Sequence, residues 1–175
     1  MALTAGFSYS CTNNGVGGIS KLYLANASSI ASYTYTSGSA ELATLAMVGS
    51  EKFYLVTGMD DTITFTETAE VTNNKIVYKP EIKVQFGPRS KAIADFLNQV
   101  KACDRFCAIM VDNSAIVAKG WATGFVPGQG LRFMAGNVQT GANVTEDSMT
   151  EMTLGHPFGM MSPTAPLISS YTIAL

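Results

Sequence analysis

The sequence predicts a mainly β protein with one amphipathic α-helix, folded as a β-sandwich or a partly open barrel from which one long β-hairpin projects. Strict two-residue alternation of apolar and polar residues runs from Asp61 to Phe86, and this period is typical of extended strands with one buried and one wet face. Only residues 90–102 carry the spacing of an amphipathic helix. The other apolar runs are short and follow one another without intervening helices, which argues against an alternating parallel α/β fold.

Length and charge distribution predict one domain whose surface suits subunit contacts. The 175 residues fit a single domain, 1–175. Charged residues make up 14% of the chain, against a usual share of about a quarter, and the first 50 residues carry only Lys21 and Glu41. Removing water from a surface of hydroxyls and small residues costs little free energy, so such a surface suits permanent contacts. Residues 1–18, which end in a glycine-rich patch, are predicted to form an N-terminal arm.

Two short strands are predicted before the long hairpin. Ile19–Asn26 alternates well enough to form the first, and Lys52–Thr57 forms the second. Between them, residues 28–39 are expected to be loop with pieces of strand. The pattern leaves the structure of the apolar stretch 41–48 open.

The alternating segment predicts one β-hairpin over residues 61–87. Asn73-Asn74 interrupts the pattern, and asparagine tolerates the positive φ of a tight turn. Arms of about ten to thirteen residues extend about 35–40 Å at about 3.3 Å per residue, roughly twice the usual strand length. Such a hairpin outgrows what a chain of this size covers by itself, so its apolar face and free edges need a partner, most simply a second copy. The residues expected at this inter-subunit hairpin are Ile76, Tyr78, Ile82, Val84 and Phe86.

The wet face of the first arm has two interpretations. Threonine has high β-propensity, so the row fits an ordinary solvent-facing strand. The same row fits the wall of a pore for nucleic acid, because neutral hydroxyls are wet without holding phosphate as lysines do. The residues of this expected luminal face are Thr62, Thr64, Thr66 and Thr68.

The only predicted helix covers residues 90–102. Gly87-Pro88 ends the hairpin, and Ser90 is a suitable N-cap. Apolar residues at i, i+3, i+4 and i+7 form one stripe that should pack on a sheet or barrel. The residues of this helix core face are Ile93, Phe96, Leu97 and Val100.

The second half of the chain adds further strands. Phe106–Val111 and Ala115–Ala122 are almost continuously apolar, so we expect two central strands, joined by a tight turn at 112–114. Strands are also predicted at 131–138 and 149–154, and a C-terminal strand at 167–175.

Several functional classes fit the composition poorly. The net charge is −2 and no basic cluster is present, so the chain lacks the means to grip nucleic acid. Three cysteines, Cys11, Cys103 and Cys107, do not form an even disulfide framework. The N-terminus has no signal-peptide pattern and no run reaches the length of a membrane span, so we expect synthesis in a cytoplasm and no membrane insertion.

The residues that carry chemistry elsewhere are sparse here. His156 is the only histidine, and a zinc site would need more ligands than the cysteines supply. A cysteine nucleophile with His156 as base is formally possible, but a lone histidine in a loop is usually only a loop residue. The glycine-rich segments 15–18 and 124–130 do not open helices and so fail as phosphate loops. We therefore expect no enzyme activity and assign no catalytic, cofactor-binding or metal residue.

The combination of features resembles the tail tube (major tail) proteins of long-tailed bacteriophages and the related inner-tube proteins of contractile injection systems. The resemblance covers most of the chain as a pattern; its most similar stretches are 18–26 and 140–154. It implies rings, commonly hexamers, that stack into a hollow tube in the virion tail, contact other tail proteins and let DNA pass without specific binding. It also implies that the long hairpins of neighbouring copies join in a continuous inner barrel, and it supplies no catalytic residues.

Three alternatives stay open at this point. The chain could form another phage tail ring, namely a terminator, connector or baseplate component. It could be a carbohydrate-binding β-sandwich with an aromatic platform supplied by Tyr33, Tyr35 or Trp121. It could also be an enzyme dependent on Cys103 or Cys107.

Overall fold

The computed structural model describes residues 18–36, 41–59, 62–112, 120–125, 128–139, 148–160, 163 and 165–166. The expected arm, apart from Gly18, and the expected strand 167–175 lie outside these residues. The prediction of a mainly β chain with one helix is confirmed: the described strands form three antiparallel sheets, and none of these sheets closes into a barrel. The elements are β1 (Ile19–Asn26), the 3-10 turn η1 (Ala27–Ser29), β2 (Ile30–Tyr35), β3 (Leu42–Met47), β4 (Tyr54–Val56), β5 (Thr64–Thr72), β6 (Lys75–Phe86), α1 (Lys91–Ala102), β7 (Phe106–Asp112), β8 (Gly120–Thr123), β9 (Arg132–Gln139), β10 (Met149–Gly155) and β11 (Ala165–Pro166).

A five-stranded sheet, which we call the central sheet, has the order β11-β8-β7-β1-β4 and is covered on both faces. Strand β7 shows why its sequence is continuously apolar. Phe106, Ala108 and Met110 belong to one buried cluster, and Cys107 and Ile109 belong to a second cluster on the opposite face. Alternate side chains of one strand therefore enter two different cores, as expected for a strand buried on both sides.

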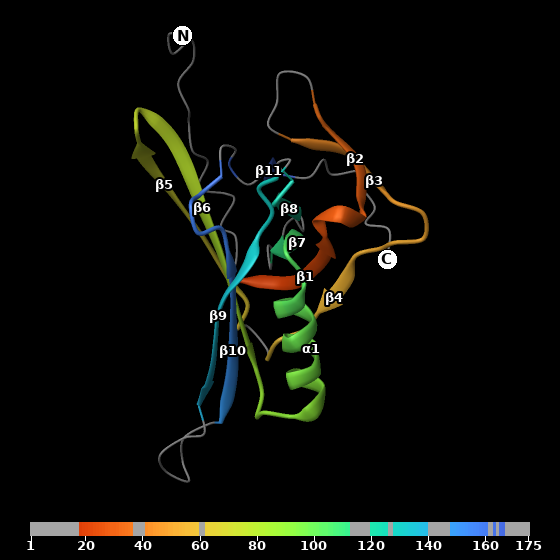
Figure 1. Ribbon diagram of the computed structural model, residues 1–175, viewed down its shortest axis with the longest axis vertical. Coiled ribbons are helices and arrows are strands. Elements are labelled where there is room, and N and C mark those ends of the chain that lie inside the picture. Colours follow the sequence, from red (N-terminus) through yellow and green to blue (C-terminus); the bar gives the residue numbers. More distant parts are fainter. Residues whose placement is uncertain are drawn as a thin grey trace, which may run out of the picture.

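The two-stranded sheet β2–β3 covers one face of the central sheet (Figure 1). Leu42 of β3 and Phe53, just before β4, are both buried in this second cluster. Phe125 packs against Phe53 and Tyr33, with ring centroids 6.4 Å and 6.0 Å apart. The aromatic contacts fix the β2–β3 layer in place.

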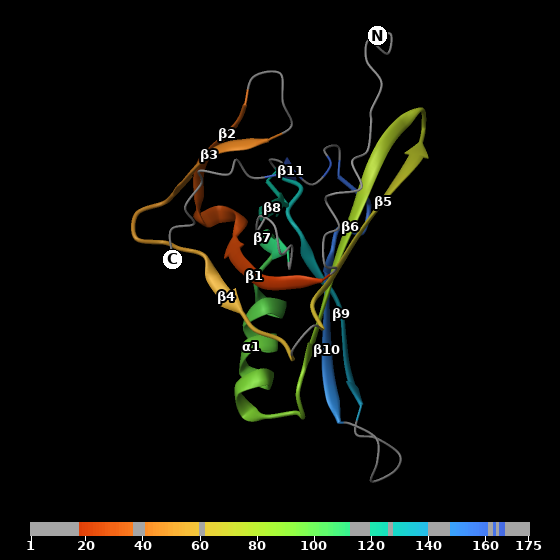
Figure 2. The ribbon, with the colours of Figure 1, turned by 180° about the vertical axis from the view of Figure 1, so that it is seen from behind.

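The other face of the central sheet packs against a four-stranded sheet of order β5-β6-β10-β9, which we call the long sheet. Its inner face contributes side chains that are 0% exposed: Ile82, Val84, Met152 and Leu154. Figures 1 and 2 show that the long sheet runs the length of the molecule, with the β5–β6 tip at one end and the far ends of β9 and β10 at the other.

Helix α1 closes the core beside the base of the long sheet and follows the predicted pattern. Its N-cap is Ser90, whose hydroxyl oxygen accepts a hydrogen bond from the Ile93 amide at 3.2 Å. Val100 is buried, and Ile93, Phe96 and Leu97 are partly buried against the same cluster. The predicted helix and its core face are confirmed.

The long hairpin forms around the predicted asparagine turn. Asn73 and Asn74 have φ of 51° and 58°, the two positive values that a two-residue hairpin turn of type I′ requires. Strands β5 and β6 pair without a break from Thr64 opposite Lys83 to Thr72 opposite Lys75. An uninterrupted register over this length makes the hairpin a straight and regular ribbon.

Two contacts hold the hairpin beyond the end of β10. Pairing between β6 and β10 stops at Glu81, so Pro80, which has no N–H, follows where no β10 partner remains. The chain then returns: the Tyr78 amide donates to the Met160 carbonyl at 2.8 Å, and the Met160 amide donates to the Tyr78 carbonyl at 2.6 Å. Past this bridge, no other described strand pairs with the hairpin.

The tight turn predicted at 112–114 is wrong. Strands β7 and β8 do pair, but Val111 lies opposite Gly120. A three-residue turn would place Val111 opposite residue 115. The connecting residues 113–119 lie outside the described residues.

Replacing Phe96 with aspartate tests the packing of α1. The Phe96 ring meets Phe86 edge-on with centroids 5.9 Å apart. We expect Phe96→Asp to lower the free energy of unfolding by about 3–5 kcal/mol, because it removes an aromatic contact and brings a charge to the core. Urea unfolding measures the loss. Asn98→Asp, on the exposed side of the helix, is the matched control, and equal losses for both variants would contradict the described packing.

Candidate assembly surface

The long hairpin has two chemically different faces, because residues that lie opposite each other in an antiparallel pair share a face. One face, the apolar face, carries Phe65 opposite Ile82 and Val71 opposite Ile76. The other, the polar face, carries Thr66 opposite Glu81. Each face has one exception: Glu67, opposite Pro80, lies on the apolar face, and Val77, opposite Glu70, lies on the polar face.

The apolar face is covered at the base and uncovered at the tip. Ile82, Val84 and Phe86 are 0%, 0% and 7% exposed within the chain itself, so their expected role as inter-subunit contacts is corrected: they belong to this chain's own core. Tyr78 is half-buried, and Ile76 is 53% exposed. Of the expected set, Ile76 and Tyr78 therefore remain accessible to a partner.

Ile76 has an exposed aliphatic neighbour across the hairpin. Val71, its partner in the register, is 74% exposed. A pair of β-branched side chains at the end of a rigid ribbon presents apolar area that folding leaves in water.

Three of the four expected luminal threonines lie on the polar face. Thr64, Thr66 and Thr68 are exposed on β5. Thr62 precedes the strand, and its hydroxyl donates to the carbonyls of Met59 at 2.8 Å and Gln85 at 3.1 Å. Thr62 is thus a structural residue at the start of the hairpin, which corrects its placement on an open wall.

Four charges of the polar face form two ion pairs within the chain, while Lys75 at the tip lies on the same face opposite Thr72. Lys79 bonds Glu70 at 2.6 Å, and Lys83 lies 3.0 Å from Glu81. All four side chains are close to half exposed, so each pair adds little stability. The pairs do give the polar face a mixed and locally balanced charge.

Among the described strands, the long sheet ends in two free edges. Strand β5 forms one edge and β9 the other, and residues 134–139 of β9 are exposed. Each neighbouring pair in the sheet is antiparallel, so β9 runs opposite to β5. Open edges of this length leave backbone donors and acceptors facing outward, which invites pairing with another chain.

A small polar cluster lies at the start of β9, around Arg132. Arg132 lies 3.5 Å and Arg105 lies 3.3 Å from the carboxylate of Asp104. Arg105 also donates to the Gly128 carbonyl. Burial, and then the two guanidinium groups, lower the pKa of His156, whose Nδ1 is buried with no hydrogen-bond partner. This end of the strand is cationic around neutral pH.

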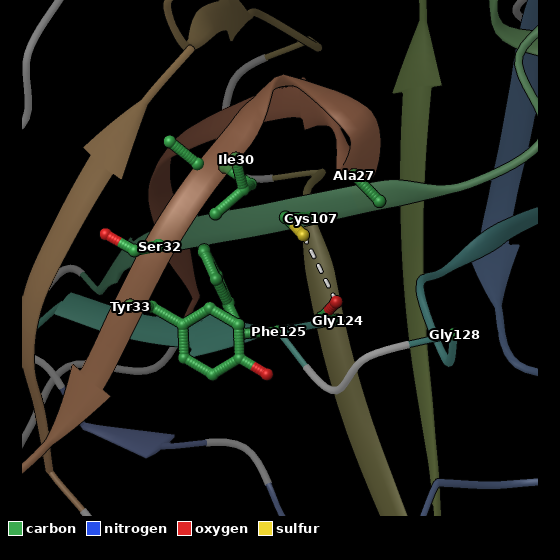
Figure 3. Close-up of a pocket in the computed structure, with 9 residues that line it drawn as sticks. Ala27, Ile30, Ser32, Tyr33, Cys107, Gly124, Phe125 and Gly128 are labelled. Atoms are coloured by element: carbon green, nitrogen blue, oxygen red, sulfur yellow. Dashed lines mark hydrogen bonds between the residues drawn. The ribbon is translucent and has the colours of Figure 1, made fainter.

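A cavity of about 510 Å³ lies between β2 and the central sheet. It is on the face of the central sheet that points away from the long sheet, and Figure 3 shows the residues that line it. Cys107 lies in its wall, and its thiol donates to the Gly124 carbonyl at 3.1 Å. Burial raises the pKa of Cys107 to about 12, which is the reverse of what a thiolate nucleophile needs. The structure does not bring His156 to this cavity, whose lining residues are Ala27, Ile30, Ala31, Ser32, Tyr33, Cys107, Gly124, Phe125 and Gly128.

The aromatic residues considered for a carbohydrate platform do not gather on one surface. Tyr33 and Tyr35 meet edge-on at 5.8 Å beside the cavity. Trp121 packs against the cluster on the opposite face of the central sheet, and its indole N–H donates to Asp112 at 3.4 Å. The three residues therefore do not form the shared aromatic platform that was expected.

Within the described part of the chain, no helix combines the length and the apolar character that crossing a bilayer requires. In the same residues, His, Cys, Asp and Glu side chains form no group of three that could hold a metal ion.

Sequence reasoning missed the second edge of the long sheet and the cluster at the start of β9. Strand β9 was predicted, but its position at an edge depends on pairing with β10, and strand order is not written in local periodicity. One weak signal of an edge was present in the sequence. Residues 134–139 form neither a continuous apolar run nor a regular alternation, so they do not have the pattern of a well-buried strand.

Alkylation tests the environment of Cys107. The raised pKa leaves about one thiol in ten thousand ionised at pH 8, so we expect iodoacetamide to leave Cys107 unmodified in the folded protein. Peptide mass spectrometry compares it with the half-buried Cys103, and urea-unfolded protein is the control. Folding favours the protonated thiol of Cys107. Its contribution to the free energy of unfolding is therefore complete below the unfolded pKa of about 8.5 and is lost as the pH rises towards 12. Rapid labelling in the folded state would contradict this environment.

Comparison with known proteins adds no relative: no family model, no curated protein and no solved structure matches this chain.

Proposed function

We propose that this chain is a structural protein of a phage virion, which forms rings that stack into a hollow tail tube for the passage of DNA. The observation that carries the proposal is the asymmetry of the long sheet. At the base of the sheet, one face is covered by the chain's own core. The other face is largely polar and carries the exposed threonines of β5, and among the described strands both long edges are unpaired. A sheet with these properties suits a segment of a larger barrel whose inside is wet.

The strand directions support closure into a ring. Because β5 and β9 run in opposite directions, β9 of one copy beside β5 of the next continues the antiparallel order. Such a contact joins two different surfaces and is therefore heterologous, the type of contact that generates rings. Closure would satisfy both free edges at once.

The dimensions suit a conduit. About six copies of a four-stranded sheet give about 24 strands, and at about 4.8 Å between strands and a tilt of about 40° the backbone barrel is roughly 40–50 Å across. Side chains of the polar face narrow this bore and still leave room for a nucleic-acid duplex. The proposal thus needs no change in the fold of the single chain.

The chemistry of the polar face suits passage rather than binding. Its hydroxyls carry no charge, and two of its lysines, Lys79 and Lys83, are paired with carboxylates of the same chain. DNA binding draws most of its strength from counterion release by unpaired Lys and Arg. A wall of neutral and balanced groups would let phosphates slide past.

Electron microscopy of the purified full-length protein tests the proposal. We expect rings or tubes with a central bore in negative stain, and open-ended growth as the concentration rises. Sedimentation velocity supplies the mass of the smallest ring. A single ring that never stacks would point to a terminator, connector or baseplate role, and a protein that stays monomeric at high concentration would contradict both roles.

A charge reversal tests which face lines the bore. Glu81 lies on the central strand β6, away from both edges, so Glu81→Lys keeps the proposed contacts and adds two positive charges per copy to the polar face. We expect assembled Glu81→Lys tubes to retain duplex DNA in a salt-dependent manner, measured by co-sedimentation. Asp95→Lys on α1 changes the net charge equally on the outer layer and is the matched control. Equal retention by both variants would remove the polar face from the bore.

A further inference from the structure

We propose that neighbouring copies join in one defined register, with β5 of one copy antiparallel to β9 of the next, Thr66 opposite Asn137 and Glu70 opposite Arg132. The inference rests on the ring of the proposed function and specifies the contact that closes it. It names the residues that meet, which neither strand order nor ring formation fixes by itself.

The lengths of the two edges match. Strand β9 carries one extra residue, because Ala135 lies opposite Thr153 while Phe133 lies opposite Leu154. With Met134 bulged, the eight residues of β9 present seven positions. Seven residues of β5, from Thr64 to Glu70, fill them, and the exposed pair at the hairpin tip extends beyond.

This register continues the polar face and the apolar face of one copy into the same faces of the next. The polar face gains Thr64 beside Gln139 and Thr66 beside Asn137, which pairs hydroxyls with amides. The apolar face gains Phe65 beside Val138, whose side chain is 43% exposed in the single chain. A slip by one residue would exchange the faces and place threonines among apolar neighbours.

Opposite charges separate this register from slips by two residues. Glu70 and Arg132 are both on the polar face and about half exposed, at 45% and 40%. Each has one partner in its own chain and spare capacity for another, because a carboxylate accepts several hydrogen bonds and a guanidinium donates five. A slip in either direction moves Arg132 opposite a threonine and leaves Glu70 without a cation from the neighbour.

The geometry of a barrel agrees with this shift. Within one copy, Thr66 lies opposite Glu81 of β6. Asn137 lies opposite Glu151 of β10, which in turn lies opposite Gln85 of β6. Pairing Thr66 of the next copy with Asn137 therefore shifts the two edges by four residues along the strands, which is the separation of Glu81 and Gln85. Four residues span about 13 Å, and four strands are about 19 Å wide, which corresponds to a strand tilt of about 35°. Closed barrels tilt their strands by about 35–45°. An unshifted contact would need upright strands, which barrels avoid.

Cysteine cross-linking tests the register. Opposite residues of paired strands have Cα atoms about 4.5–5.5 Å apart, within the range of a disulfide. We expect the double variant Thr66→Cys/Asn137→Cys to form a ladder of covalent oligomers on oxidation, seen on a non-reducing gel. The slipped pairs Thr66→Cys/Gln139→Cys and Thr66→Cys/Ala135→Cys should give at least tenfold less, and the single variants report any contribution of the native thiols.

The possible outcomes distinguish the register, the β5–β9 contact and the ring. A ladder that is strongest for a slipped pair overturns the register and leaves the ring intact. Rings seen by microscopy with no ladder from any pair overturn the β5–β9 contact. A monomer that yields neither rings nor cross-links overturns this inference together with the proposed function.

The charge contact has its own test. Glu70→Gln and Lys79→Gln both break the Lys79–Glu70 pair within the chain, but only Glu70→Gln also removes the partner of Arg132. We expect Glu70→Gln to raise the concentration needed for ring formation about fivefold or more and to weaken its salt dependence, while Lys79→Gln changes it less than twofold. Equal effects of the two variants would overturn the Glu70–Arg132 contact.

Discussion

The long sheet has one face that must be covered and two edges that the described chain does not pair, and the rest of the molecule is arranged around this constraint. The apolar face is buried by the central sheet and α1 at its base, where Ile82 and Met152 lose all contact with solvent. The same face continues past that cover to Val71 and Ile76, which stay in water. A two-stranded ribbon with an uncovered apolar face is unstable by itself. Pairing with β10 and the bridge to Met160 hold the base of the ribbon, and its tip stays exposed in the single chain.

Stability and assembly fall on different layers. The central sheet is buried on both faces by two separate clusters, which places most of the apolar burial around β1 and β7. The cavity beside Cys107 and the aromatic contacts of Phe125 lie on the face of the central sheet that β2 and β3 cover. The long sheet takes only one face of this core and keeps its polar face and edges outside it. Changes on the polar face of β5 or β9 can therefore alter association while the core stays intact.

Local patterns of the sequence were sufficient for the elements with strong periodicity. The Asn73-Asn74 turn and the Ser90 cap follow from backbone and hydrogen-bond chemistry within a few residues, and both occur where they were predicted. Strand order could not be obtained in this way, because β6 pairs with β10, whose residues lie about 65 positions further along the chain. That pairing decides that Val84 is a core residue and that β9 is an edge. The error in assigning Ile82, Val84 and Phe86 to a subunit contact has the same origin: alternation shows that a face is apolar, but not which layer covers it.

For the proposed assembly, the choice between a closed ring and a pair of subunits depends on the two edges of the long sheet. A two-fold contact would join β5 to β5 or β9 to β9, and either would leave two long edges exposed at the ends of an enlarged sheet. Natural edge strands usually carry charged residues or proline as protection against such growth, and β5 has two glutamates, Glu67 and Glu70, but no lysine or proline. Only the heterologous contact pairs every edge, and the opposite directions of β5 and β9 permit it without reversing any strand. In the proposed ring, this edge would be paired with β9 of the next copy.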